Sequence, residues 1–179
     1  MTETAPVPTK LSRAELPVAI LLTQGLSLTG IATRLHLSPR TVHCHLRRIR
    51  RKMDLPGIRR TPLVNVLLER RLVPTPIPGR AAPALPADDL ALLEAIAHEP
   101  SLDAIAVRMG ISRRKVSARI DYLIEVAGAI STEHLVTLAR GWQLLGTGQN
   151  LTVADTDRTA PPVSPSPDTA DWATTPDAA

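Results

Sequence analysis

Apolar residues recur along this chain at spacings of three and four positions, and no segment alternates between apolar and polar residues as a strand does. Spacings of three and four positions gather apolar side chains on one face of a helix, so we predict an all-α protein. Two blocks, residues 11–72 and 87–148, each hold four such segments. In the first block the predicted helices are Arg13–Gln24, Leu28–Leu35, Pro39–Lys52 and Thr61–Arg71.

The segments outside the two blocks have a different composition. Residues 73–86 contain five prolines and one glycine, which exclude a helix and favour an extended linker. Residues 149–179 are rich in Thr, Pro, Asp and Ala and offer too little apolar surface to offset the entropy of ordering. We therefore predict a disordered acidic, Pro-rich tail at residues 149–179 and a disordered arm at residues 1–10.

The two blocks resemble each other in sequence, which predicts a tandem repeat. An offset of 74 residues aligns several positions of the first block with the second, and an offset of 72 aligns the last part. The aligned pairs are Ser27-Leu28 with Ser101-Leu102, Ile31-Ala32 with Ile105-Ala106, Arg34 with Arg108, Leu37-Ser38 with Ile111-Ser112, Val42 with Val116, Leu63-Val64 with Leu135-Val136, and Leu72 with Leu144.

A tight turn separates the second and third predicted helices of each block. Ser38 is a good N-cap residue and Pro39 suits the first helical position, so the third helix has a clear start. Ser112 has the same place in the second block. The connections His36-Leu37 and Gly110-Ile111 leave room only for a short turn. This order of elements predicts two helix-turn-helix domains, the second a degenerate copy of the first.

On these residues the first block resembles the LuxR-type helix-turn-helix domain of bacterial transcription regulators. The positions that carry the resemblance are Leu11, Ser12, Glu15, Gly25, Leu26, Ser27, Ile31, Ala32, Leu35, Ser38, Thr41, Val42, His45, Ile49, Lys52 and Met53, and the departures are Leu28, Gly30 and His43. The resemblance implies a bacterial transcription regulator that binds double-stranded DNA. It also implies that Ser38, Thr41 and Lys52 contact the DNA backbone.

The third predicted helix has one apolar face and one basic face. On a helical wheel, Val42, Leu46, Ile49 and Met53 form a stripe that we expect to be buried. Arginine on the opposite face can grip guanine edges or phosphates in the major groove. The candidate DNA-binding residues are Ser38, Arg40, Thr41, His43, Cys44, Arg47, Arg48, Arg51 and Lys52. We expect His45, at the edge of the buried stripe, to have a structural role.

The charge of the chain is unevenly distributed. Residues 11–80 carry 13 Lys and Arg against 3 Asp and Glu, residues 81–150 carry 6 against 8, and residues 151–179 carry 1 against 5. A basic first block is the electrostatic pattern expected of a surface that binds a polyanion. In the second block, Asp121 and Glu125 stand where the first has Arg47 and Arg51, so we expect the second copy not to recognise sequence.

The fourth predicted helix of each block is the candidate pairing surface, because the resemblance implies dimerisation there. The residues are Leu63, Val66, Leu67 and Arg70 in the first block, and Leu135, Leu138, Ala139 and Trp142 in the second. Three arrangements remain open: an intramolecular pseudo-dimer, a homodimer, and binding to another regulator or RNA polymerase. The linker is long enough to span the distance of about 34 Å between two half-sites.

Other classes of function find little support in the sequence. No His, Cys and carboxylate cluster has catalytic spacing, so we expect no enzyme and no cofactor. Cys44 is the one cysteine, and neighbours in His43-Cys44-His45 point about 100° apart, so we expect no metal site. No apolar run is long enough for a membrane span, which predicts a cytoplasmic protein that is nucleoid-associated when bound. The alternative function is an adaptor or anti-activator that pairs with other regulators.

Overall fold

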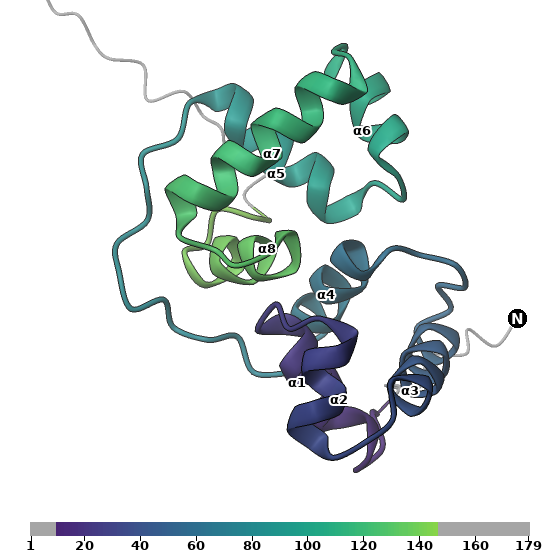
Figure 1. The fold of residues 1–179 in the computed structure, drawn as a ribbon. Coiled ribbons are helices and arrows are strands. Elements are labelled where there is room, and N and C mark those ends of the chain that lie inside the picture. Colours follow the sequence, from purple (N-terminus) through teal and green to yellow (C-terminus); the bar gives the residue numbers. More distant parts are fainter. Residues whose placement is uncertain (1–9, 147–179) are drawn as a thin grey trace, which may run out of the picture.

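The computed structural model describes residues 10–146, and this part of the chain contains eight helices and no strand (Figure 1). The helices are α1 (Glu15–Thr23), α2 (Leu28–Leu35), α3 (Pro39–Lys52), α4 (Arg60–Glu69), α5 (Ala87–His98), α6 (Leu102–Met109), α7 (Arg113–Ala127) and α8 (Thr132–Gly141). The prediction of an all-α protein is confirmed. The predicted tail lies outside the described residues, as does all but the last residue of the predicted N-terminal arm.

The bounds of α2 and α3 are those predicted. Helix α1 is shorter at both ends, and α4 begins one residue earlier and ends two residues earlier than predicted. The start of α1 is set by a capping box, in which the Ser12 N–H donates to Oε2 of Glu15 at 2.7 Å and the Glu15 N–H donates to Oγ of Ser12 at 3.3 Å. At the end of α4, Arg71 takes a left-handed conformation (φ 53°), and the Leu72 N–H bonds back to the Leu67 carbonyl. These local bonds stop the helix before the apolar pattern ends.

The first four helices form one compact unit. Helix α1 packs against α2, α3 and α4, and α2 packs against α3. The turn between α2 and α3 is closed by His36 in the left-handed region (φ 54°) and by a bond from the Leu37 N–H to the Ala32 carbonyl at 2.9 Å. Ser38 then caps α3 by accepting from the Thr41 N–H at 3.1 Å. This turn fixes the direction in which α3 leaves α2.

The second four helices have the same backbone features at corresponding positions. Their turn uses Gly110 (φ 64°), a bond from the Ile111 N–H to the Ala106 carbonyl, and Ser112 as the cap of α7. Left-handed residues and cap residues recur with offsets of 74 or 72 residues. The corresponding pairs are Ser27 with Ser101, His36 with Gly110, Ser38 with Ser112, Asp54 with Gly128, and Arg71 with Gln143.

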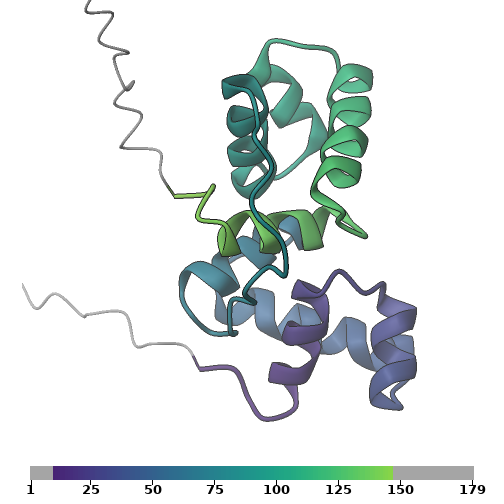
Figure 2. The same cartoon turned by 90° about the vertical axis from the view of Figure 1, so that its left-hand side faces the viewer.

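The two halves of the fold meet where α4 packs against α8, in the middle of the molecule (Figures 1 and 2). Leu63 and Leu67 on α4 and Leu135 and Ala139 on α8 are at most 1% exposed. Helix α8 also contacts α1, and α4 contacts α5. The apolar core therefore continues from one half into the other.

Polar side chains cross the same contact. Asn65 is 1% exposed; its Oδ1 accepts from Nε of Arg140 at 2.8 Å, and its Nδ2 lies 3.3 Å from Nε2 of His98. Arg60 forms an ion pair with Glu133 at 3.4 Å, and Arg140 lies 3.8 Å from Glu69. The buried amide is thus partnered by side chains of the other half.

The proline-rich connection between α4 and α5 passes along the outside of the molecule (Figures 1 and 2). Its backbone is attached to the second half, because the Trp142 indole N–H donates to the Arg80 carbonyl at 2.9 Å. The Arg80 guanidinium donates to the Val126 carbonyl at 2.8 Å and lies 5.9 Å from the centre of the Trp142 ring. The connection contains no helix, as the prolines predict.

A glycine permits the close approach of the two halves beside α4. Gly25 joins α1 to α2 with φ 82°, and a Cβ there would lie 2.6 Å from Oγ of Ser131 and 2.7 Å from Cβ of His134. Both the backbone conformation and the missing side chain are needed at this point. Within residues 10–146, no helix is long and apolar enough to cross a membrane.

Candidate nucleic-acid interface

Helix α3 is held by its apolar face. Val42, Leu46, Ile49 and Met53 are at most 1% exposed, as the helical wheel predicts. They pack toward α1 and α2, and α3 is the second helix of the helix-turn-helix. Ser38 caps its N-terminus, and three basic residues in its last turn complement the negative end of the helix dipole. A rigid helix with a fixed orientation results.

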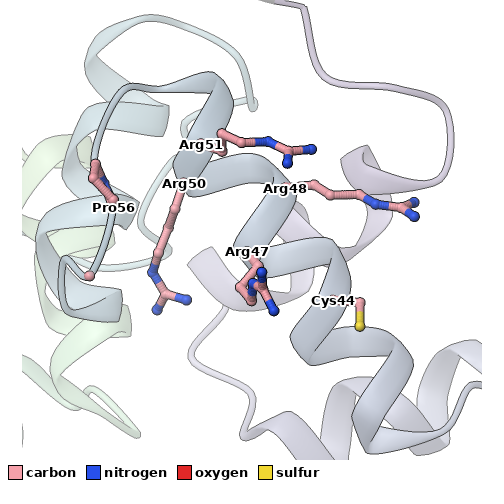
Figure 3. Close-up of a pocket in the computed structure, with 7 residues that line it drawn as sticks. Cys44, Arg47, Arg48, Arg50, Arg51 and Pro56 are labelled. Carbon is pink, nitrogen blue, oxygen red and sulfur yellow. The ribbon is translucent and has the colours of Figure 1, made fainter.

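The opposite face of α3 is basic and exposed. Arg40, Arg47, Arg48 and Arg51 are exposed, and within the described residues none of these guanidinium groups has a hydrogen bond or an ion pair. Figure 3 shows Arg48 and Arg51 extending from one side of the helix and Arg47 from another. Since arginine pairs on one helix face repel each other, this arrangement is costly without an anionic partner.

A hollow beside the C-terminal half of α3 is lined by four of its arginines (Figure 3). Its volume is about 530 Å³. The lining residues are Cys44, Arg47, Arg48, Arg50, Arg51, Pro56 and Gly57, with no acidic residue among them. Guanidinium groups around a concave surface are well suited to phosphate oxygens. The hollow extends the basic face toward the connection between α3 and α4.

Arg50 is a member of this site that the sequence did not indicate. Its Nε donates to the Ile58 carbonyl at 2.9 Å, which holds the connection between α3 and α4 against the helix. Burial lowers the pKa of the Arg50 guanidinium, and the nearby positive charge of Arg60 lowers that pKa further. Arg50 was not among the residues assigned to the basic face, and only the folded connection reveals its contact.

The other candidate DNA-binding residues lie around the ends and edges of α3. Ser38 and Thr41 are at its N-terminus, where their hydroxyl oxygens are 2.8 Å apart and backbone N–H groups favour an anion. His43 and Cys44 are exposed on the helix, and the Cys44 thiol is free. His45 is half-buried, and its Nδ1 has no hydrogen-bond partner within the described residues.

Lys52 lies at the far end of α3 and is paired with a buried carboxylate. Its Nζ is 2.6 Å from Oε2 of Glu15, which is 3% exposed at the start of α1. Burial raises the pKa of the Glu15 carboxyl, but hydrogen bonds from Lys52 and Ser12 outweigh it, so the pKa lies below its usual value. The ion pair joins the start of α1 to the end of α3. The positive charge of Lys52, which was assigned to DNA contact, is therefore balanced by Glu15 in this structure.

Helix α7 has the same buried stripe as α3 with a different outer face. Val116, Ile120, Leu123 and Ala127 are buried, at positions that correspond to the stripe of α3 with an offset of 74 residues. Asp121 and Glu125 are exposed where α3 has Arg47 and Arg51. Two arginines of α7 are paired: Arg119 with the buried Asp89 at 2.7 Å, and Arg113 with Asp103 at 3.3 Å. Arg114 and Lys115 are exposed at the start of the helix. The outer face of α7 is therefore less suited to a polyanion.

The predicted pairing residues of α4 and α8 fall into two groups, apolar residues that are buried or half-buried and two residues with polar contacts elsewhere. Four are buried on the two helices that pack against each other between the halves: Leu63, Leu67, Leu135 and Ala139. Val66 and Leu138 are half-buried. Two others have different contacts: Arg70 is exposed with Nη1 3.9 Å from Sδ of Met53, and Trp142 donates to the linker.

The comparison with known proteins bears on the first unit. Residues 9–61 match the family described as bacterial regulatory proteins, luxR family. The matched segment includes α1, α2 and α3 and ends at the start of α4, so it contains the whole basic face. Searches of curated proteins and of solved structures found no match. Residues 9–61 are therefore a LuxR-type helix-turn-helix domain, which implies a DNA-binding transcriptional regulator.

Proposed function

We propose that the protein is a sequence-specific transcription regulator that places α3 in the major groove of duplex DNA. The observation that carries the proposal is the basic face of α3. Its four exposed arginines have no partner within the described residues, while the other face is fixed in the core. Arginine in this position can bind guanine edges by two hydrogen bonds or can hold phosphates.

The roles along α3 follow from position. Arg47, Arg48 and Arg51 provide most of the contact with bases and phosphates, with Arg40, His43 and Cys44 on the same exposed surface. Ser38 and Thr41 lie at the helix N-terminus, where a backbone phosphate is favoured. Lys52 has three donors, so its ammonium can hold Glu15 and still reach a phosphate at the other edge.

We further propose that helices α5–α8 are a degenerate second copy of the helix-turn-helix domain. The recurring caps and left-handed turns with constant offsets support the duplication. In this proposal α8 occupies the pairing surface of α4 as an intramolecular partner. The packing of α4 against α8, with Leu63 and Leu67 of α4 buried, supports that role. An adaptor that pairs with other regulators through α4 would first have to separate α4 from α8.

The proposed function is tested by measuring duplex binding across salt concentrations. We expect replacement of Arg47, Arg48 and Arg51 by Ala to weaken binding and to lower the slope of log affinity against log salt by about two to three charges. Fluorescence anisotropy with a labelled duplex gives both quantities. All three side chains are exposed, so the folded state is expected to survive the change.

The matched control removes three positive charges from the second half, by Ala at Arg113, Arg114 and Lys115. We expect this variant to bind with nearly the wild-type salt slope. Normal binding by the α3 variant would show that another surface binds DNA. Equal losses in both variants would instead show a general charge effect.

A further inference from the structure

A second hollow lies where the two halves meet, and it shares Arg50 with the hollow beside the exposed arginine face. It is bounded by α3, the start of α4 and the start of α8, and its volume is about 490 Å³. The polar residues that line it are His43, Arg50, Arg59, Arg60, Thr61 and Glu133. We call it the inter-half pocket, because Glu133 comes from the second half and the other five come from the first.

The inter-half pocket has an excess of positive charge. Three arginines line it, and Glu133 is the one carboxylate among the lining residues. That carboxylate forms an ion pair with Arg60 at 3.4 Å, which leaves Arg50 and Arg59 without an acidic partner in the pocket. The lowered pKa of Arg50, caused by burial and then by the charge of Arg60, reflects the same crowding. An anion in the hollow would relieve the repulsion.

The guanidinium of Arg59, which lines the hollow, also has a buried nitrogen without an acceptor. Nη1 of Arg59 is buried from solvent and lacks a partner within the described residues. Buried donors are almost always satisfied in folded proteins, so a rotation of this side chain toward a ligand oxygen in the hollow would satisfy a nitrogen that is otherwise unpartnered. The N-terminus of α4 begins at the same place, with Arg60 and Thr61 in its first turn. Its free N–H groups add to the attraction for an anion.

We propose that the inter-half pocket binds a phosphate group. Guanidinium groups match phosphate oxygens in geometry, and a dianion would balance the excess charge of the lining. Arg50, Arg59 and Arg60 all line the hollow, so their guanidinium groups provide the donors for the phosphate oxygens. The phosphate has two possible sources, the backbone of bound DNA or a small phosphorylated molecule in solution. The first source rests on the proposed function, and the second does not.

Glu133 gives the second half control over this pocket. Its side chain is 13% exposed and holds Arg60, so it competes with an incoming phosphate for the same guanidinium. Removing its charge frees Arg60 and takes away a nearby repulsion. The second half therefore sets the affinity of a site whose basic residues all belong to the first.

The test uses the full chain and two opposite substitutions, Arg59→Gln and Glu133→Gln. Thermal unfolding is measured in inorganic phosphate and in pyrophosphate, each against chloride at equal ionic strength. A second arm measures duplex binding across salt concentrations. Arg108→Gln is the charge-matched control, since Arg108 lies on α6 and pairs with Glu99 outside the pocket.

A small-molecule source predicts that phosphate raises the unfolding temperature of the wild type and of Arg108→Gln. The rise is larger in Glu133→Gln and absent in Arg59→Gln. A DNA source predicts no such rise. Instead, Arg59→Gln lowers the salt slope of DNA binding by about one charge and Glu133→Gln tightens binding several-fold. In phosphate-free buffer, Arg59→Gln should not unfold below the wild-type temperature, because Nη1 has no partner to lose and the change removes one of the crowded positive charges.

The proposal is overturned if Arg59→Gln and Glu133→Gln both behave as the wild type in the two arms. Its failure is distinguishable from failure of the proposed function. The phosphate arm contains no DNA, so its result stands whether or not α3 binds a duplex. Conversely, loss of DNA binding in the Arg47, Arg48 and Arg51 variant tests α3 without touching Arg59 or Glu133.

Discussion

At the scale of single residues, the sequence predicts what depends on near neighbours. The cap at Ser38 and the buried stripe that begins at Val42 follow from spacings within one helix, and both are present in the structure. The pair of Glu15 and Lys52 could not be predicted in this way. The two residues are 37 positions apart, and only the packing of α1 on α3 brings their charges together.

This ion pair should contribute to stability, because Glu15 is buried and accepts from Lys52 and Ser12. We expect Lys52→Met to lower the free energy of unfolding by about 1–3 kcal/mol, since it leaves a buried carboxylate with one fewer donor. Glu15→Gln should recover part of that loss in the double variant. Chemical denaturation of the four proteins measures the coupling between the two residues.

The ion pair also predicts how the free energy of unfolding changes with pH. The pKa of Glu15 is lower in the folded state than in the unfolded chain, so its contribution is fully present above the unfolded value. It is lost as the pH falls through the lowered folded-state pKa and the carboxyl is protonated in the folded state. If Lys52→Met were as stable as the wild type at pH 7, the ion pair would have no energetic role.

At the scale of elements, α3 shows how a helix can be well positioned by one face and destabilised by the other. The helical wheel predicted a buried stripe and a basic face on α3 from the helical period alone. The burial of the four stripe residues confirms the predicted stripe. The wheel missed Arg50, whose contact with the Ile58 carbonyl depends on how the following connection folds. Connections of this kind have no periodic pattern from which to predict them.

The like charges on α3 predict a measurable cost. Arg47 lies three and four positions before Arg50 and Arg51, so its charge opposes both. We expect Arg47→Ala to raise the free energy of unfolding by about 0.2–1 kcal/mol at low salt, from lost repulsion and better helix propensity. Denaturant unfolding at low and high salt separates these two contributions.

At about 1 M salt, where charges farther than about 3 Å apart are screened, the electrostatic part of this gain should vanish. A gain that is unchanged by salt would mean that repulsion does not act on this face. A loss of stability at low salt would mean that Arg47 has a stabilising contact in the free protein.

At the scale of the whole molecule, the two halves share one apolar core and a buried polar contact. The tandem organisation was predicted from aligned residues, and the structure adds matching turns at the same offsets. The sequence could not decide between pairing within one chain and pairing between chains, because the same apolar residues of α4 suit both. The packing of α4 on α8 supports the first arrangement. It depends on contacts between residues more than 60 positions apart, such as Asn65 and Arg140.

In the proposed function, α3 recognises DNA sequence and α7 does not. Selection of bound duplexes from a random DNA pool by the full chain tests it most directly. We predict one short half-site in the selected sequences, lost when Arg47, Arg48 and Arg51 are replaced by Ala and retained when Asp121 and Glu125 are. Two half-sites at a fixed spacing from a single chain, or a pool without any shared sequence, would contradict the claim.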